Sequence, residues 1–132
     1  MTQPCPCGSK LPFPRCCGRY LGHFDDTPAP DAEALMRSRY SAFVLLDRDY
    51  LLATWHESRR PADLELDAGA KWLGLEVRKH KRIDDSHAEV EFVARYRVAG
   101  PSAGSGRAVR IHERSRFVRE NGRWYYLDGD ML

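Results

Sequence analysis

The stretch 90–98 reads Val90-Glu91-Phe92-Val93-Ala94-Arg95-Tyr96-Arg97-Val98. Apolar side chains occupy its even positions, and charged side chains occupy the odd positions up to Arg97, with Val93 as the exception. Because successive side chains of a β-strand point to opposite faces, this alternation predicts a strand with one buried and one wet face. The stretch 73–78, with Leu73, Leu75 and Val77 on one face, predicts a neighbouring strand of the same kind.

Turn signals extend this sheet towards the C-terminus. The Gly- and Ser-containing segment from Ala99 to Gly106 predicts a hairpin loop, and Asn121-Gly122 is a strong signal for a tight hairpin. The second hairpin joins a predicted strand near 108–119 to another at 124–127. Together these segments predict an antiparallel sheet of about four strands.

Helical patterns precede the strands. Asp31 is a good helix N-cap, and apolar residues recur at helical spacing from Leu35 through about Leu46. Asp47 or Asp49 starts a second, shorter predicted helix, and a third piece is predicted between Pro61 and Ala70. About three helices followed by strands indicate the α+β class.

All four cysteines lie in one short segment, at Cys5, Cys7, Cys16 and Cys17. A bridge between adjacent cysteines is strained, because neighbouring Cα atoms lie about 3.8 Å apart and disulfides usually need about 4.4–6.8 Å. Four thiolates can instead close a tetrahedral site, which would be structural because no position is left for water. We therefore predict structural zinc, with iron as the rival metal and His23 as the alternative ligand.

Length and charge limit the other possibilities. The chain has 132 residues, enough for one domain with a small appendage, and its net charge of +2 does not by itself indicate a nucleic-acid-binding protein. No apolar run approaches the roughly 18 residues of a membrane helix. The first residues lack the basic and apolar regions of a secretion signal, so we expect a cytoplasmic protein without membrane insertion.

The cysteine segment resembles a known motif. The run Cys5-Pro6-Cys7-Gly8-Ser9-Lys10 and the run Cys16-Cys17-Gly18, with eight residues between Cys7 and Cys16, are similar to the SEC-C motif. This motif is a zinc-binding element at the C-terminus of the SecA translocation ATPase and in small bacterial proteins. The spacer 11–15 departs from the usual Lys-rich pattern. The resemblance implies a protein-docking or ribosome-proximal surface, on which we expect Phe13, Arg15, Arg19 and Tyr20 to be presented.

The resemblance then extends along the chain. The segments 36–43, 72–75, 92–95, 113–117 and 122–129 are similar to the YchJ-like bacterial family. That resemblance implies an NTF2-like fold, in which helices close over a curved sheet to form a cone with a pocket. We expect a zinc knuckle over 1–22 and the NTF2-like domain over 23–132.

The inner face of the sheet supplies candidate pocket residues. Alternation that turns Val109, Ile111 and Phe117 inward also turns Glu113 and Ser115 inward, and a buried carboxylate needs a partner. Arg37 or Arg39 is the expected partner of Glu113. The enzymatic interpretation makes Glu113 a general acid or base, and the structural one makes it half of an ion pair. The pocket candidates are Arg37, Arg39, Tyr40, Trp55, His56, Glu113, Ser115 and Trp124.

The outer face of the sheet is predicted to be basic. Its candidates are Arg95, Arg97, Arg110, Arg114 and Arg116. Such a stripe can bind phosphates, although Glu89 and Glu91 are expected to share the face and to pair with the arginines.

The sequence therefore favours a zinc-binding, non-enzymatic adaptor that binds a protein partner or the ribosome through its knuckle. The alternative is an enzyme or small-molecule binder that uses the pocket around Glu113 and Ser115. Nucleic-acid binding and a homodimer are further predictions.

Overall fold

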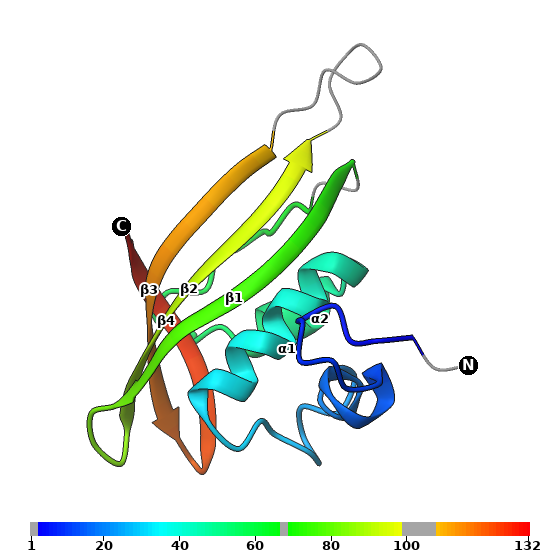
Figure 1. The fold of residues 1–132 in the computed structure, drawn as a ribbon. Helices are drawn as coiled ribbons and strands as arrows, with labels where there is room; N and C mark the ends of the chain where they lie inside the picture. The colour runs from blue at the N-terminus through cyan, green and yellow to red at the C-terminus, as the bar shows by residue number, and fades with distance from the viewer. Residues whose placement is uncertain (1–2, 67–68, 99–107) are drawn as a thin grey trace.

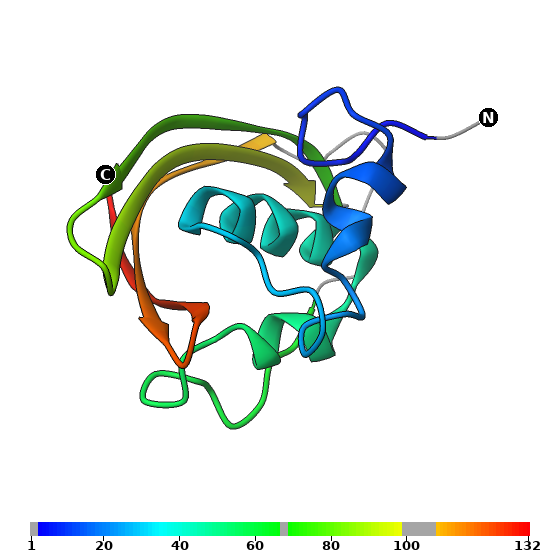
Figure 2. The same cartoon turned by 90° about the horizontal axis from the view of Figure 1, so that it is seen from below.

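The computed structural model describes residues 3–66, 69–98 and 108–132. Figure 1 shows a curved sheet with one long helix, α1, against its concave side and the cysteine-containing segment beside that helix. Seen from below, the sheet curls around α1 (Figure 2). The strands are antiparallel in the order β1-β2-β3-β4, which confirms the α+β class and the predicted four-stranded sheet. Their bounds are Ala70–Arg82, His87–Val98, Ala108–Glu120 and Arg123–Met131.

The predicted alternation holds in the central strand and fails in part of its neighbour. In β2, Val90, Phe92 and Ala94 are buried and face the helix layer. In β1, Leu73 is 44% exposed, against the prediction that it shares the buried face of Leu75. The register shifts between Trp72 and Gly74, so a β-bulge leaves Leu73 without a cross-strand partner and turns it outward. In β3, Val109 is 37% exposed at the very start of the strand, against the prediction that it faces inward with Ile111.

The tight hairpin between β3 and β4 is confirmed. Asn121 and Gly122 have φ values of 52° and 79°, both in the left-handed region. Turns of this hand match the right-handed twist of the flanking strands, and Asn-Gly is the pair that adopts them at least cost. The predicted loop from Ala99 to Gly106 lies outside the described residues.

Two of the predicted helices are confirmed. Helix α1 spans Ala32–Leu45 and α2 spans Arg48–Ala53. An aspartate caps each of them: Asp31 accepts a hydrogen bond of 2.7 Å from the Ala34 amide, and Asp47 accepts one of 3.1 Å from the Tyr50 amide. Leu46, between them, has a φ of 59°, and α2 packs against α1.

The predicted third helix is wrong. Residues 61–66 form an irregular segment, and β1 has begun by Ala70. Arg48 holds this segment from outside, because its guanidinium donates to the Leu64 carbonyl and to the Asp63 carboxylate, each at 2.7 Å. Leu64 and Leu66 pack at two-residue spacing against the core beneath α2, a spacing that an extended chain provides and a helix does not.

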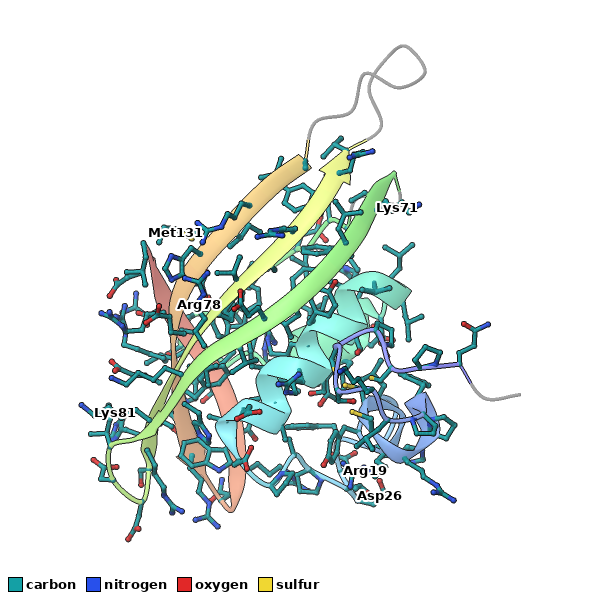
Figure 3. All side chains as sticks on the ribbon, viewed as in Figure 1. Arg19, Asp26, Lys71, Arg78, Lys81 and Met131 are labelled. Atoms are coloured by element: carbon teal, nitrogen blue, oxygen red, sulfur yellow. The ribbon has the colours of Figure 1, made fainter. Side chains whose placement is uncertain are left out.

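The core fills the space between α1 and the sheet, where side chains from both layers interdigitate (Figure 3). Leu35, Val90 and Phe117 are at most 1% exposed. The segment after α2 joins the edge of β4, where Trp55 bridges to Tyr126 and their rings lie 5.2 Å apart. In the part of the chain that the structure describes, no helix has the length and apolar character needed to cross a membrane.

Candidate metal centre and ligand pocket

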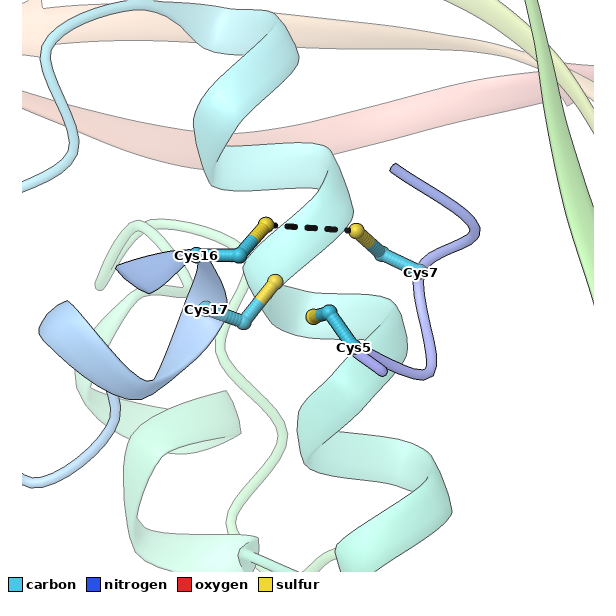
Figure 4. Close-up of side chains that lie close together, drawn as sticks. All are labelled: Cys5, Cys7, Cys16 and Cys17. Carbon is cyan, nitrogen blue, oxygen red and sulfur yellow. Dashed lines mark hydrogen bonds between the residues drawn. The ribbon is translucent and has the colours of Figure 1, made fainter. Parts of the chain in front are cut away.

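The four cysteine sulfurs converge from two short segments. Figure 4 shows Cys5 and Cys7 on one segment facing Cys16 and Cys17 on the other. All four Sγ atoms lie within 4.8 Å of one another, and all four residues are buried. Two single-turn 3-10 helices, η1 (Phe13–Arg15) and η2 (Cys17–Arg19), shape the second segment. Gly18 is required there, because a Cβ atom at this position would lie 2.7 Å from the Phe13 carbonyl oxygen.

The donor set fits a tetrahedral metal ion. Zn–S bonds near 2.3 Å place the sulfurs of a tetrahedral site about 3.8 Å apart, and the Sγ atoms of Cys7 and Cys16 are separated by 3.6 Å. The four cysteines could therefore hold a metal ion with little rearrangement. His23 is not part of the group; it is exposed and lies 3.5 Å from the Asp26 carboxylate.

Hydrogen bonds and burial shift the pKa values of the cysteine thiols. A hydrogen bond from the Cys17 thiol lowers the pKa of Cys7 to about 4, and the same contact raises the pKa of Cys17. Burial raises the pKa of Cys16. The cluster thus favours a thiolate at Cys7, the form in which sulfur binds a metal.

Three polar side chains surround the cysteines, and the sequence did not single them out for this role. Ser9 Oγ lies 3.1 Å from Cys16 Sγ, and Ser41 Oγ lies 3.5 Å from Cys5 Sγ. Arg37 Nη1 donates to the Cys7 carbonyl at 3.1 Å and places a positive charge beside the thiolates. Arg37 and Ser41 are four residues apart on α1 and so share one helix face, a spacing visible in the sequence.

The knuckle presents fewer side chains than predicted. Arg15 and Arg19 are exposed, and Figure 3 shows Arg19 at the surface beside the knuckle. Tyr20, by contrast, is 6% exposed and packs in the core with Tyr50 and Leu51. Phe13 is partly buried against the core. The expectation that these two aromatic residues are presented is wrong, because they anchor the knuckle to the domain.

A cavity of about 390 Å³ lies between α1 and the concave face of the sheet. Most of its wall is apolar, with Phe92, Ala94 and Ile111 supplied by the sheet. Leu46, Glu65 and Val98 line one end and are exposed, so the cavity opens there. The predicted pocket residues that line it are Arg39, Tyr40, Trp55, Glu113 and Ser115.

Arg39 is a buried cation in this cavity. It is 4% exposed, and its Nη1 donates to the Leu51 carbonyl at 2.8 Å and to Thr54 Oγ1 at 2.7 Å. The guanidinium lies over two aromatic rings, 5.2 Å from the centroid of Trp55 and 4.6 Å from that of Tyr126. Burial lowers the pKa of Arg39 to about 10, which still leaves it protonated at neutral pH.

The predicted ion pair between Glu113 and Arg37 or Arg39 is wrong. The Glu113 carboxylate accepts a short hydrogen bond from Ser115 Oγ and another of 3.3 Å from the Tyr126 hydroxyl, both on Oε2. The Tyr126 ring packs beneath Arg39 while its hydroxyl binds Glu113, so this side chain stands between the two charges. Arg37 is on the opposite side of α1, bound to Glu33 at 3.1 Å.

Three predicted pocket residues lie elsewhere. Arg37 contacts the metal centre, as described above. His56 is held at the β3–β4 end of the molecule, with Nε2 2.7 Å from Glu120 and Nδ1 2.7 Å from Ser58. Trp124 is 5% exposed and belongs to the core. Trp72 and Tyr126 also line the cavity, and sequence reasoning did not include them among the pocket candidates. Their aromatic side chains indicate burial in the core but do not show that they border a cavity.

The outer face of the sheet is basic in part. Arg95 and Arg110 are direct cross-strand partners, and Arg114 faces Glu91. Glu91 is instead bound by His112 at 2.8 Å, a contact that lowers the pKa of Glu91. Arg116 binds Asp128 at 2.6 Å and Asp130 at 2.7 Å, so its charge is balanced within the sheet. Of the five predicted arginines, four make no ion pair with any described residue: Arg95, Arg97, Arg110 and Arg114.

Binding of this face to polyanions stays a prediction with a direct test. We expect a triple alanine variant of Arg97, Arg110 and Arg114 to elute from heparin at lower salt than the wild type, because fewer counterions are released on binding. A control variant removes the same number of exposed charges from the knuckle, at Lys10, Arg15 and Arg19. Equal elution of the two variants would show that only net charge matters.

The structure combines an antiparallel sheet that curls around a helix, a pocket between them, and a four-cysteine knuckle N-terminal to both. These features define an NTF2-like protein with an N-terminal SEC-C motif. The family model described as "YchJ, middle NTF2-like domain" matches residues 31–129, and the model of the SEC-C motif matches residues 1–19. The chain therefore belongs to the YchJ-like family, as the sequence predicts.

Relatives and solved structures agree with this assignment. A "UPF0225 protein" of Polaromonas sp. is 61% identical over 96% of this chain and 91% of its own, and one of Bordetella pertussis is 56% identical over 96% and 92%. The solution structure of a SEC-C motif containing protein from Rhodopseudomonas palustris superposes with a TM-score of 0.81 at 34% identity, covering 98% of this chain and 99% of that one. A crystal structure of another, from Psychrobacter arcticus, gives 0.75 at 33%, covering 96% and 81%.

Proposed function

We propose that the protein is a zinc-stabilised docking module, in which Zn²⁺ at the four cysteines fixes the knuckle and the knuckle binds an acidic segment of a partner protein. The convergence of four buried sulfurs within 4.8 Å carries the proposal. Four thiolates complete the tetrahedron, so the ion is structural. Iron would occupy the same thiolate site and is the alternative that metal analysis distinguishes.

The exposed chemistry of the knuckle supports an acidic partner. Leu11 is 49% exposed, and the basic side chains of Lys10, Arg15 and Arg19 are exposed on the same short segment. None of the three makes an ion pair with a residue in the described ranges; Arg19 Nε donates to the Cys16 carbonyl at 3.1 Å. An apolar side chain with nearby unpaired cations suits an acidic peptide that carries an apolar residue.

Charge reversal tests this role. We expect a protein captured by the zinc-loaded chain to be lost when Lys10, Arg15 and Arg19 are changed to Glu, and also after chelation. Lys81→Glu, on β1 and remote from the knuckle in Figure 3, is the control that should retain the partner. Capture of the same protein by the triple variant would overturn the proposal, and capture of RNA would assign the surface to a ribosomal contact.

The cavity favours a second role, the binding of a small molecule. Its volume of about 390 Å³ falls within the range of roughly 300–1,000 Å³ that ligand pockets occupy. Because Ser115 and Tyr126 occupy one oxygen of Glu113, the arrangement favours binding over acid–base catalysis. Mass spectrometry of molecules released from denatured native protein tests this role; Ala94→Phe, which fills the cavity, should release none.

A homodimer through the sheet stays a prediction.

A further inference from the structure

The buried end of the cavity contains an incompletely used guanidinium. Only Nη1 of Arg39 donates to the protein, to the Leu51 carbonyl and Thr54 Oγ1 at the end of α2. Nε and Nη2 have no acceptor among the described residues. Among the described residues, the side-chain nitrogens that are both fully buried and unpaired are Trp55 Nε1 and Arg123 Nε. Nε and Nη2 of Arg39 do not belong to this group, so each keeps some exposed surface. The Nε and Nη2 donors of Arg39 are therefore reachable from the cavity that this residue lines.

The surroundings of Arg39 leave one direction of approach. The rings of Trp55 and Tyr126 pack against the guanidinium, and the Nη1 donor is occupied. The Nε and Nη2 pair is the remaining edge, and two parallel N–H donors of this kind match the two oxygens of a carboxylate. Leaving the donors of a buried guanidinium unpaired is costly, so an acceptor is expected to reach them.

We propose that the cavity binds a small organic monoanion, a carboxylate attached to an apolar body, with the carboxylate on Arg39 and the body against Phe92, Ala94 and Ile111. This inference rests on the second proposed role, ligand binding in the cone. A single guanidinium within largely apolar walls suits one negative charge. Glu113 in the same cavity disfavours a second one by like-charge repulsion, so a phosphate dianion is the poorer match.

The test compares octanoate with octan-1-ol, two probes with the same chain and different charge, on the metal-loaded full-length protein. The indole ¹H–¹⁵N signals of Trp55 and Trp72 report binding, since both residues line the cavity. We expect octanoate to bind about 10- to 100-fold more tightly than octan-1-ol, because hydrogen bonds to a charged group contribute that much binding free energy. Both probes should shift the two indole signals when the cavity is saturated.

Three variants sharpen the comparison. Arg39→Met should reduce octanoate affinity to that of octan-1-ol, while Glu113→Gln should increase it several-fold by removing the repulsive charge. Arg78→Met removes a guanidinium from β1, outside the cavity lining, and should change neither affinity. If Arg39→Met does not fold, the affinities of the wild type and of Glu113→Gln for octanoate and octan-1-ol still test the anion site.

The outcomes distinguish the anion site at Arg39 from ligand binding in the cone in general. Equal affinity for both probes, or weaker octanoate binding in Glu113→Gln, would overturn the anion site while leaving the pocket as a binder of neutral molecules. No change in the Trp55 and Trp72 signals with either probe would overturn the anion site and ligand binding in the cone together.

Discussion

Replacing Cys16 and Cys17 by serine is expected to release the metal and to unfold the knuckle. Structural zinc contributes about 10–16 kcal/mol of apparent binding free energy in small peptides, and serine hydroxyls do not replace thiolates as ligands. The four cysteines also belong to the same buried cluster as Leu35 and Val90, so their release loosens the packing of α1. We expect the melting temperature to fall by more than about 10 °C.

Three measurements check this prediction. Native mass spectrometry should find one metal ion in the wild type and none in the variant, with elemental analysis distinguishing zinc from iron. Hydrogen exchange should increase strongly over residues 3–22 and moderately in α1. His23→Ala, which removes the alternative ligand predicted from the sequence, should leave metal content unchanged. A wild type that contains two disulfides and no metal would contradict the prediction.

Phe117→Ala is expected to be the most destabilising single change in the sheet. Phe117 is 1% exposed, follows the β-bulge at Arg116, and packs edge-on against Tyr126 with ring centroids 5.7 Å apart. Removing a buried aromatic ring costs about 3–5 kcal/mol through lost burial and the cavity that remains. The total stability of a typical domain is about 5–15 kcal/mol, so this loss is a large part of it.

Denaturant unfolding measures that loss directly. Val109→Ala is the matched control on the same strand, because Val109 is 37% exposed and its truncation should change the unfolding free energy by at most about 0.5 kcal/mol. Metal binding should persist in Phe117→Ala, since the cysteines lie on the other side of α1. A loss below about 1 kcal/mol for Phe117→Ala would mean that the sheet collapses around the missing ring.

The two arginines of α1 illustrate how far sequence reasoning reaches. The sequence makes both Arg37 and Arg39 pocket candidates and leaves either as the partner of Glu113, although residues two apart on a helix point in different directions. The structure sends Arg37 to the metal centre and Arg39 into the cavity. Helical periodicity could have excluded one of them from the pocket. It could not have told which one, because that depends on how α1 is rotated against the sheet.

Other errors have the same origin in long-range contacts. Leu73 follows the alternation of its strand in sequence, and a bulge reverses its direction. The stretch 61–66 contains residues compatible with a helix, but Arg48 and the core beneath α2 hold it extended. Tyr126 separates Glu113 from Arg39, and nothing in local sequence places a tyrosine between those two charges.

By itself the sequence determined the α+β class, the four strands, the two capped helices, the Asn121-Gly122 turn and the grouping of four cysteines. These features follow from residue spacing and turn chemistry, which act over a few neighbouring residues. Only the tertiary structure decided that the knuckle aromatics are buried, that Arg37 serves the metal centre, and that Arg39 keeps free donors in a cavity. Those properties depend on register, bulges and helix rotation, which bring together side chains far apart in the chain.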